Sequence, residues 1–135
     1  MNPIQWIRDK IKVHQPDIFI DPVAIMAKIM GKVNEFRKNQ SLSVLAIDRK
    51  AETAAIAWAA SIAKSGKPDH GGIADRIVMT VPVEILSMEN LAAAVIEEWA
   101  ADPKIAVILQ GRYRGMAMGI ATGPDDLAYF VLDFS

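Results

Sequence analysis

One face of a short segment near the end of the chain carries only glycine and alanine. In residues 115–122, GMAMGIAT, the alternation typical of a β-strand separates the glycines and alanines from the larger side chains. A strand face without large side chains allows a helix or a ligand to lie close to its backbone. The Gly-Pro-Asp-Asp turn at 123–126 leads into a second strand-like segment at 127–134, so the two segments predict a hairpin.

Two helices are expected before this hairpin. Asp21-Pro22 is a capping residue followed by proline, which opens a helix, and Asp48 caps a second helix that ends at Ser65-Gly66. The inward face of the first helix consists of Met26, Ile29, Met30, Val33 and Phe36. The inward stripe of the second is mainly alanine and consists of Ala51, Ala54, Ala55, Trp58, Ala59 and Ile62. Because alanine adds so little bulk, another element must approach this second helix closely.

The middle of the chain combines a loop, short strands and a further helix. These elements are a KPDHGG loop at 67–72, strands at 76–81 and 83–88 around Pro82, and a helix from about residue 90 to residue 101. The helix turns Leu91, Val95 and Trp99 inward, and Pro103 either ends it or starts a new turn.

Together these elements predict a single domain of the α+β class. A chain of 135 residues is long enough to bury one hydrophobic core, and 52% hydrophobic with 23% charged residues is a globular composition. The strands are joined by tight turns or lie late in the chain, which favours an antiparallel sheet with helices packed against it. Residues 1–21 are expected to form a short N-terminal helix to about Lys12 and an extended connector.

Charge and composition exclude several classes of function. Fifteen basic against 16 acidic residues give a net charge of -1, so we expect no nucleic-acid partner. No stretch reaches the roughly 18 apolar residues of a membrane span, and the absence of cysteine excludes disulfides and thiol chemistry. The first residues lack the apolar run of a secretory signal. We therefore expect a cytoplasmic protein or a component of an assembled particle, unless a leader has been removed.

Several segments resemble the CAP superfamily of cysteine-rich secretory, antigen 5 and pathogenesis-related proteins (SCP-like domains), in its bacterial or phage type. They are VNEFRKNQSLSVLAID with Asn34 and Arg37, the alanine-rich helix before His70, Arg76, the pair Glu89-Asn90, Trp99 and the closing segment RGMAMGIATGPDDLAYFVLDF. The match covers residues 22–135 in the family's order, and residues 1–21 lie outside it. It implies a three-layer α/β/α sandwich with a central, mostly antiparallel sheet.

The resemblance also implies a cleft, and here the chain departs from the family. Members often hold a divalent metal with two histidines and two acidic residues. His70 and Glu89 match the first histidine and the first acid, but Ile105 stands where the second histidine is expected. Asp102 lies near the place of the second acid, and the stretch between Asn90 and Trp99 is shorter than usual. The cleft residues implied are therefore His70, Glu89, Asn90 and Asp102.

Structural interpretations of these residues stay open beside the functional ones. His70 lies in a glycine-rich loop, where it is either available for function or simply exposed. Asn90 can cap the following helix, with Glu89 accepting nearby backbone donors. Zinc needs three or four ligands, and His14 would have to fold back to help His70 and Glu89. We expect no cofactor, or at most a weakly bound divalent metal. Arg112 and Arg114, in GRYRG, form a small basic and aromatic patch that we interpret as an exposed turn.

Three functions remain open from the sequence. The favoured one is a non-catalytic CAP-like binding or interaction module with a degenerate cleft. The second is a structural subunit of a phage particle or another assembly, and the third is a metal-assisted or acid–base hydrolase using His70, Glu89 and Asp102. A protein partner or self-association is favoured over a small-molecule substrate. A lipid ligand stays open, because the family has been linked to sterol and fatty-acid binding.

Overall fold

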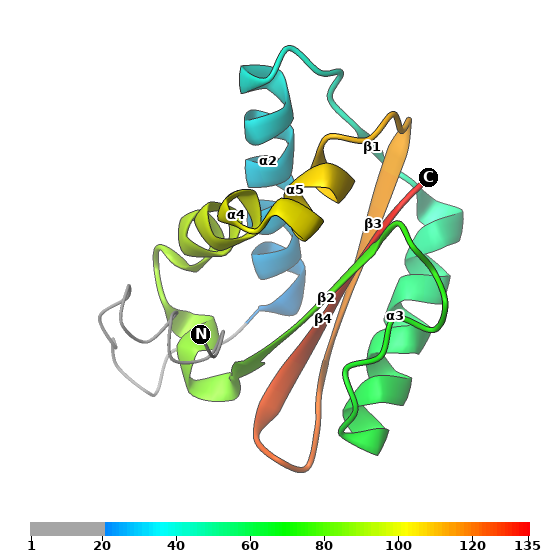
Figure 1. Ribbon diagram of the computed structural model, residues 1–135. Helices are drawn as coiled ribbons and strands as arrows, with labels where there is room; N and C mark the ends of the chain where they lie inside the picture. The colour runs from blue at the N-terminus through cyan, green and yellow to red at the C-terminus, as the bar shows by residue number, and fades with distance from the viewer. Residues whose placement is uncertain (1–20) are drawn as a thin grey trace.

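Two helical layers enclose a four-stranded sheet in the computed structural model of the protein, which describes residues 21–135 (Figure 1). The elements are α2 (Pro22–Asn39), β1 (Ala46–Ile47), α3 (Arg49–Ser65), β2 (Arg76–Pro82), η1 (Val83–Ser87), α4 (Leu91–Ala101), α5 (Pro103–Leu109), β3 (Gly115–Thr122) and β4 (Leu127–Phe134). The helix α3 covers one face of the sheet, while α2 and α4 lie on the other (Figure 1). The predicted N-terminal helix and His14 lie outside the described residues.

The sheet is built around the predicted closing hairpin. Its strand order is β1-β3-β4-β2, with β1 parallel to β3 and the other two pairs antiparallel. The hairpin register runs from Met116 opposite Phe134 to Thr122 opposite Ala128. The predicted α+β sandwich with a mostly antiparallel sheet is therefore confirmed.

The glycine and alanine face of β3 packs directly against α3. A Cβ atom added to Gly119 would lie 2.5 Å from the carbonyl oxygen of Ala55, which is backbone and cannot rotate away. Ala55, Ala59 and Ala117 are all fully buried at this contact. The element that approaches the alanine-rich helix is thus the small-residue face of the sheet. The prediction was wrong for one residue of the inward stripe of this helix, because Ala54 is exposed.

The opposite face of the sheet carries the larger core. Met116 and Met118 point to this side and pack with the buried residues of α2 and α4. The predicted inward residues of α4 are confirmed, since Leu91, Val95 and Trp99 are buried. In α2 the innermost residues are Ile29, Met30, Val33 and Arg37. The sheet therefore has a thin contact with α3 and a thicker, side-chain-filled contact with the other helices.

Two short elements differ from the sequence expectation. The segment predicted as a strand at 83–88 is instead the 3-10 helix η1. The partner strand β4 begins at Leu127, opposite Pro82, so beyond one bond from the Val83 N–H to the Asp126 carbonyl there is no strand for the chain to pair with. The two-residue strand β1 was missed, because both of its residues are exposed and too few to show alternation. Pro103 starts a new helix, α5, at its first turn.

Alanine should change the stability of the protein in opposite directions at Gly119, which lies at the contact between α3 and the sheet, and at Gly31, which does not. Gly119→Ala forces the added methyl group into the backbone of α3, so we expect a loss of about 1–3 kcal/mol in the free energy of unfolding. Gly31→Ala is the control, because Gly31 lies exposed within α2 with nothing within 4 Å of an added Cβ. That variant should gain about 1 kcal/mol from helix propensity. Urea unfolding measures both, and equal midpoints would contradict the close contact.

Candidate functional site

The structure distributes the expected cleft residues over three connections. His70 lies exposed between α3 and β2, Glu89 lies exposed between η1 and α4, and Asp102 joins α4 to α5. Within residues 21–135, no three histidine, cysteine or acidic side chains lie close enough together to hold a metal ion. His70, Glu89 and Asp102 therefore do not form a common metal-binding group.

Asp102 serves the start of α5. Its Oδ1 accepts a hydrogen bond from the backbone N–H of Lys104 at 3.0 Å, as an N-cap residue does. The backbone N–H of Asp102 in turn bonds to the carbonyls of Glu98 and Trp99 at the end of α4. Ile105 follows one turn later and packs, partly buried, against the main core. The two positions at which the resemblance led us to expect the second acid and the second histidine thus have structural roles here.

Glu89 borders a groove beside the start of α2. The groove measures about 170 Å³ and has Lys28 and Glu89 among its lining residues. A second, mostly apolar groove of about 400 Å³ shares Ile25 and Leu86 with it. The two grooves together form a depression between α2, η1 and the end of β3.

The expectation that the Asn90 side chain caps α4 was wrong. Asn90 does occupy the N-cap position, but its side chain makes no capping hydrogen bond. Its backbone has φ -102° and ψ 21°, whereas a capping residue normally has extended ψ. The Asn90 carbonyl accepts a bond from the Ala94 N–H, but the Asn90 side chain is exposed beside Glu89 and makes no bond to the helix.

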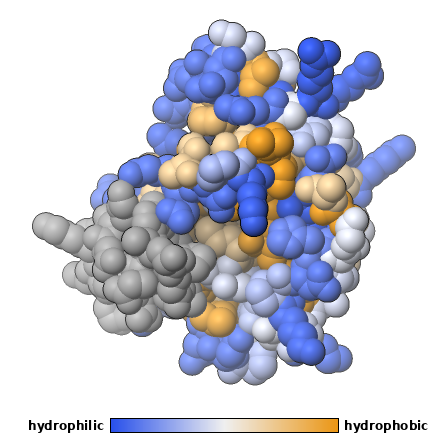
Figure 2. All heavy atoms as spheres, in the orientation of Figure 1, coloured by the Kyte–Doolittle hydropathy of each residue, from blue (hydrophilic) through white to orange (hydrophobic). Residues whose placement is uncertain are grey.

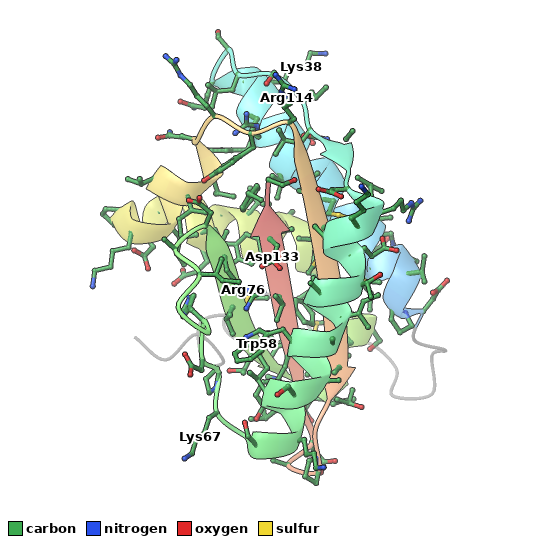
Figure 3. All side chains as sticks on the ribbon, turned by 90° about the vertical axis from the view of Figure 1, so that its right-hand side faces the viewer. Lys38, Trp58, Lys67, Arg76, Arg114 and Asp133 are labelled. Atoms are coloured by element: carbon green, nitrogen blue, oxygen red, sulfur yellow. The ribbon has the colours of Figure 1, made fainter. Side chains whose placement is uncertain are left out.

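A buried ion pair joins two neighbouring strands on the α3 side of the sheet. Arg76 and Asp133 are opposite in the register of β2 and β4, and only 3% and 8% of their surfaces are exposed. Nε and Nη2 of Arg76 donate to the two carboxylate oxygens at 2.6 and 2.9 Å. Trp58 of α3 covers the guanidinium, whose carbon lies 5.3 Å from the ring centroid (Figure 3). Paired and hydrogen-bonded, both charges are tolerated in the interior.

The same cluster fixes the loop that carries His70. Nε1 of Trp58 donates to the carbonyl of Asp69 at 2.7 Å, and Nη1 of Arg76 donates to the carbonyl of His70 at 3.2 Å. Gly71 has φ +63°, and a Cβ atom there would lie 2.9 Å from the Trp58 ring. The backbone around His70 is thus held against α3. The role of Asp133 was missed, because a partner 57 positions away from Arg76 leaves no local sequence signal.

A second buried arginine, Arg37, lies in the last turn of α2. Only 1% of its surface is exposed, and it donates hydrogen bonds to the carbonyls of Ser43, Leu109 and Gly111. Its guanidinium carbon lies 5.8 Å from the centre of the Tyr113 ring, which itself stacks on Phe134. Desolvation by burial lowers the pKa of Arg37. In contrast to Arg76, it has no carboxylate partner among the described residues.

Comparison with known proteins agrees with this architecture. Residues 30–134 match the Cysteine-rich secretory protein family, abbreviated CAP. The chain belongs to the CAP family. An outer surface protein from Borrelia burgdorferi has a similar structure, with a TM-score of 0.70, 19% identity, and coverage of 85% of this chain and 94% of that chain. At this identity the likeness shows a common fold. A search of curated protein sequences found no significant match.

The resemblance found in the sequence is therefore confirmed for this CAP domain. Asn34, part of the segment that carried it, exchanges two hydrogen bonds with the backbone of Leu45 at 3.0 and 2.7 Å. Among the described residues on the face seen in Figure 2, hydrophilic side chains alternate with patches of apolar surface. Among residues 21–135, no helix combines the length and the hydropathy that crossing a membrane requires.

Removing one partner of the buried ion pair should destabilise the CAP domain strongly. Arg76→Gln leaves Asp133 buried without its cation, so we expect a loss of about 3–5 kcal/mol in the free energy of unfolding. Arg49→Gln is the matched control, because Arg49 pairs with Glu52 at the surface, and it should cost less than about 1 kcal/mol. Chemical unfolding followed by tryptophan fluorescence compares them. Similar losses in both variants would contradict the assigned role of the pair.

Both tyrosines of the chain should lose their protons at a higher pH than an ordinary tyrosine does. Burial and a hydrogen bond to Asp75 raise the pKa of Tyr113 to about 12, and a hydrogen bond to Asp125 together with burial raises the pKa of Tyr129 to about 12. Because tyrosine in an unfolded chain has a pKa of about 10, the stability that these groups contribute is fully present below pH 10. It is lost as the pH rises toward 12.

Tyrosinate absorbance measures this titration, with the urea-unfolded chain as reference. We expect the native protein to show no step near pH 10 while its circular dichroism remains native. A native protein that ionises both tyrosines near pH 10 would contradict the two hydrogen bonds.

Proposed function

We propose that this CAP domain is a non-catalytic binding module whose cleft has lost the family's metal and acid–base chemistry. The observation that carries the proposal is the local role of the second acid and second histidine positions. Asp102 binds the first turn of α5, and Ile105 packs against the core. A scaffold that keeps its fold while these positions serve packing is suited to binding rather than to catalysis.

The requirements of metal chemistry support the same proposal. A zinc site needs three or four nitrogen, oxygen or sulfur ligands at about 2 Å from the ion. The described residues contain no group of three such side chains, and His70 brings no second histidine with it. Metal-assisted hydrolysis would therefore require a rearrangement of separate loops. The family acid Glu89 is available for binding instead, since it lies at the surface beside the groove at Ile25 and Leu86.

A protein partner fits the surface better than a small substrate does. The grooves beside α2 are partly open to solvent, whereas pockets for small ligands enclose most of the ligand surface. Large apolar side chains are exposed elsewhere too, with Val23 and Val107 at 69% and 70% exposure. The Borrelia protein of similar fold is described as an outer surface protein. A surface role for this domain is consistent with that likeness.

Calorimetric titration with zinc tests the loss of cleft chemistry. We expect no saturable heat for the full chain, and the same result for His70→Ala and Glu89→Gln. Ile105→His is an informative addition, because it restores the missing imidazole without changing His70 or Glu89. Saturable binding by the full chain that disappears in His70→Ala would overturn the proposal. Binding gained by Ile105→His would show that the loops do gather a site.

Light scattering during size-exclusion chromatography separates a binding module from a structural subunit. A binding module should elute as a monomer or a small closed oligomer over a wide range of concentrations. Growth into large particles as the concentration rises would contradict this proposal and favour the assembly subunit.

A further inference from the structure

Arg37 is a buried cation whose charge is only partly compensated. Nε donates to Ser43 at 2.9 Å, and Nη1 donates to Leu109 and Gly111 at 2.9 and 2.7 Å. All three acceptors are neutral carbonyls, and the described residues offer Arg37 no carboxylate. The chain solves the same problem differently at Arg76, where Asp133 supplies a full negative charge. A buried guanidinium without a counterion favours an external anion.

The remaining nitrogen of Arg37, Nη2, keeps a small contact with solvent, within the 1% of the residue's surface that is exposed. The three hydrogen bonds leave both N–H groups of Nη2 without an acceptor among residues 21–135. Every fully buried side-chain nitrogen or oxygen in this part of the chain has a partner, so Nη2 is not fully buried. Arg37 lines an open groove of about 340 Å³ between the end of α2 and the connection from α5 to β3. The guanidinium therefore forms part of the floor of this groove.

Two further cations line the same groove. Arg112 and Arg114 are exposed, and their side chains form no hydrogen bond or ion pair with the described residues. The remaining lining residues are Leu42, Ser43, Gly111 and Tyr113, so no acidic side chain of residues 21–135 borders the groove. In Figure 3, Arg114 and Lys38 both lie at the end of the molecule opposite Lys67. The exposed turn expected from GRYRG is thus the wall of a basic groove.

We propose that this groove binds an oxyanion, namely a phosphate or sulfate group carried by a larger ligand. Arginine presents planar N–H donors that match the oxygen spacing of such groups, and Nη2 of Arg37 is prepositioned by the three bonds that hold the rest of its guanidinium. Arg112 and Arg114 would close over the anion from the rim. The site does not depend on the proposed non-catalytic role, because an enzyme or an assembly subunit could carry the same groove.

Titration of the full, isotope-labelled chain with inorganic phosphate, followed by amide NMR at constant ionic strength, tests the site. We expect saturable shifts confined to residues near Ser43 and 111–114, with a dissociation constant in the millimolar range or tighter. Arg112→Gln combined with Arg114→Gln should weaken binding about tenfold, since charge-assisted hydrogen bonds are lost. Lys64→Gln combined with Lys67→Gln is the matched control. This control also removes two positive charges, but Lys67 lies at the end of the molecule opposite Arg114 (Figure 3).

The result that overturns the proposal is equally defined. Shifts that are absent, scattered over the surface, or weakened equally by both double variants would leave Arg37 as a structural clamp only. The phosphate titration of folded Arg37→Lys gives a second check. This variant keeps the positive charge but loses the planar donors, so we expect it to bind phosphate more weakly than the unaltered chain. Glycerol phosphate and vesicles of phosphatidylcholine with phosphatidic acid then separate the sources of the anion. Binding to either supports the groove, and the stronger one identifies a soluble ester or a lipid headgroup.

Discussion

The close contact between α3 and the sheet is the constraint on which the other features depend. At Gly119 the backbones of β3 and α3 approach so closely that no side chain fits between them. This contact brings Trp58, one turn of helix beyond Ala55, over the strands, where it covers the Arg76–Asp133 pair. The same indole then holds the loop at Asp69 through a hydrogen bond. A wider separation of the two layers would expose the ion pair and release that loop.

The CAP scaffold and the CAP cleft are separable in this chain. The scaffold depends on burial and on the two arginine clusters, which use different kinds of partner: Arg37 bonds to neutral carbonyls and Arg76 to a carboxylate. The cleft depends on side chains that must converge from several connections, and here these connections have other roles. Asp102 and Ile105 show this most clearly, because a capped helix and a packed core residue occupy the places where acid–base groups were expected. The sandwich of sheet and helices is thus present although residues 21–135 gather no group of three metal-ligating side chains.

Local signals in the sequence were sufficient for most of the fold. Caps, alternation and the turn at 123–126 predicted α2, α3, β2 and the closing hairpin, because each depends on residues that are neighbours in the chain. The 3-10 helix at Val83–Ser87 was not predictable in this way, since it forms past Leu127, the first residue of the partner strand β4. The site could be predicted only as a set of candidate residues. Whether they converge depends on long-range packing, and the Arg76–Asp133 pair and the groove over Arg37 are likewise visible only in three dimensions.

The central claim is that the CAP fold persists here while its cleft no longer assembles a metal site. Anomalous diffraction from crystals of the full chain grown with zinc tests this most directly, because it locates the ion together with its ligands. The account predicts no zinc peak shared by His70, Glu89 and Asp102, with any surface zinc bound through single side chains. A peak ligated by two or more of these three residues would contradict it.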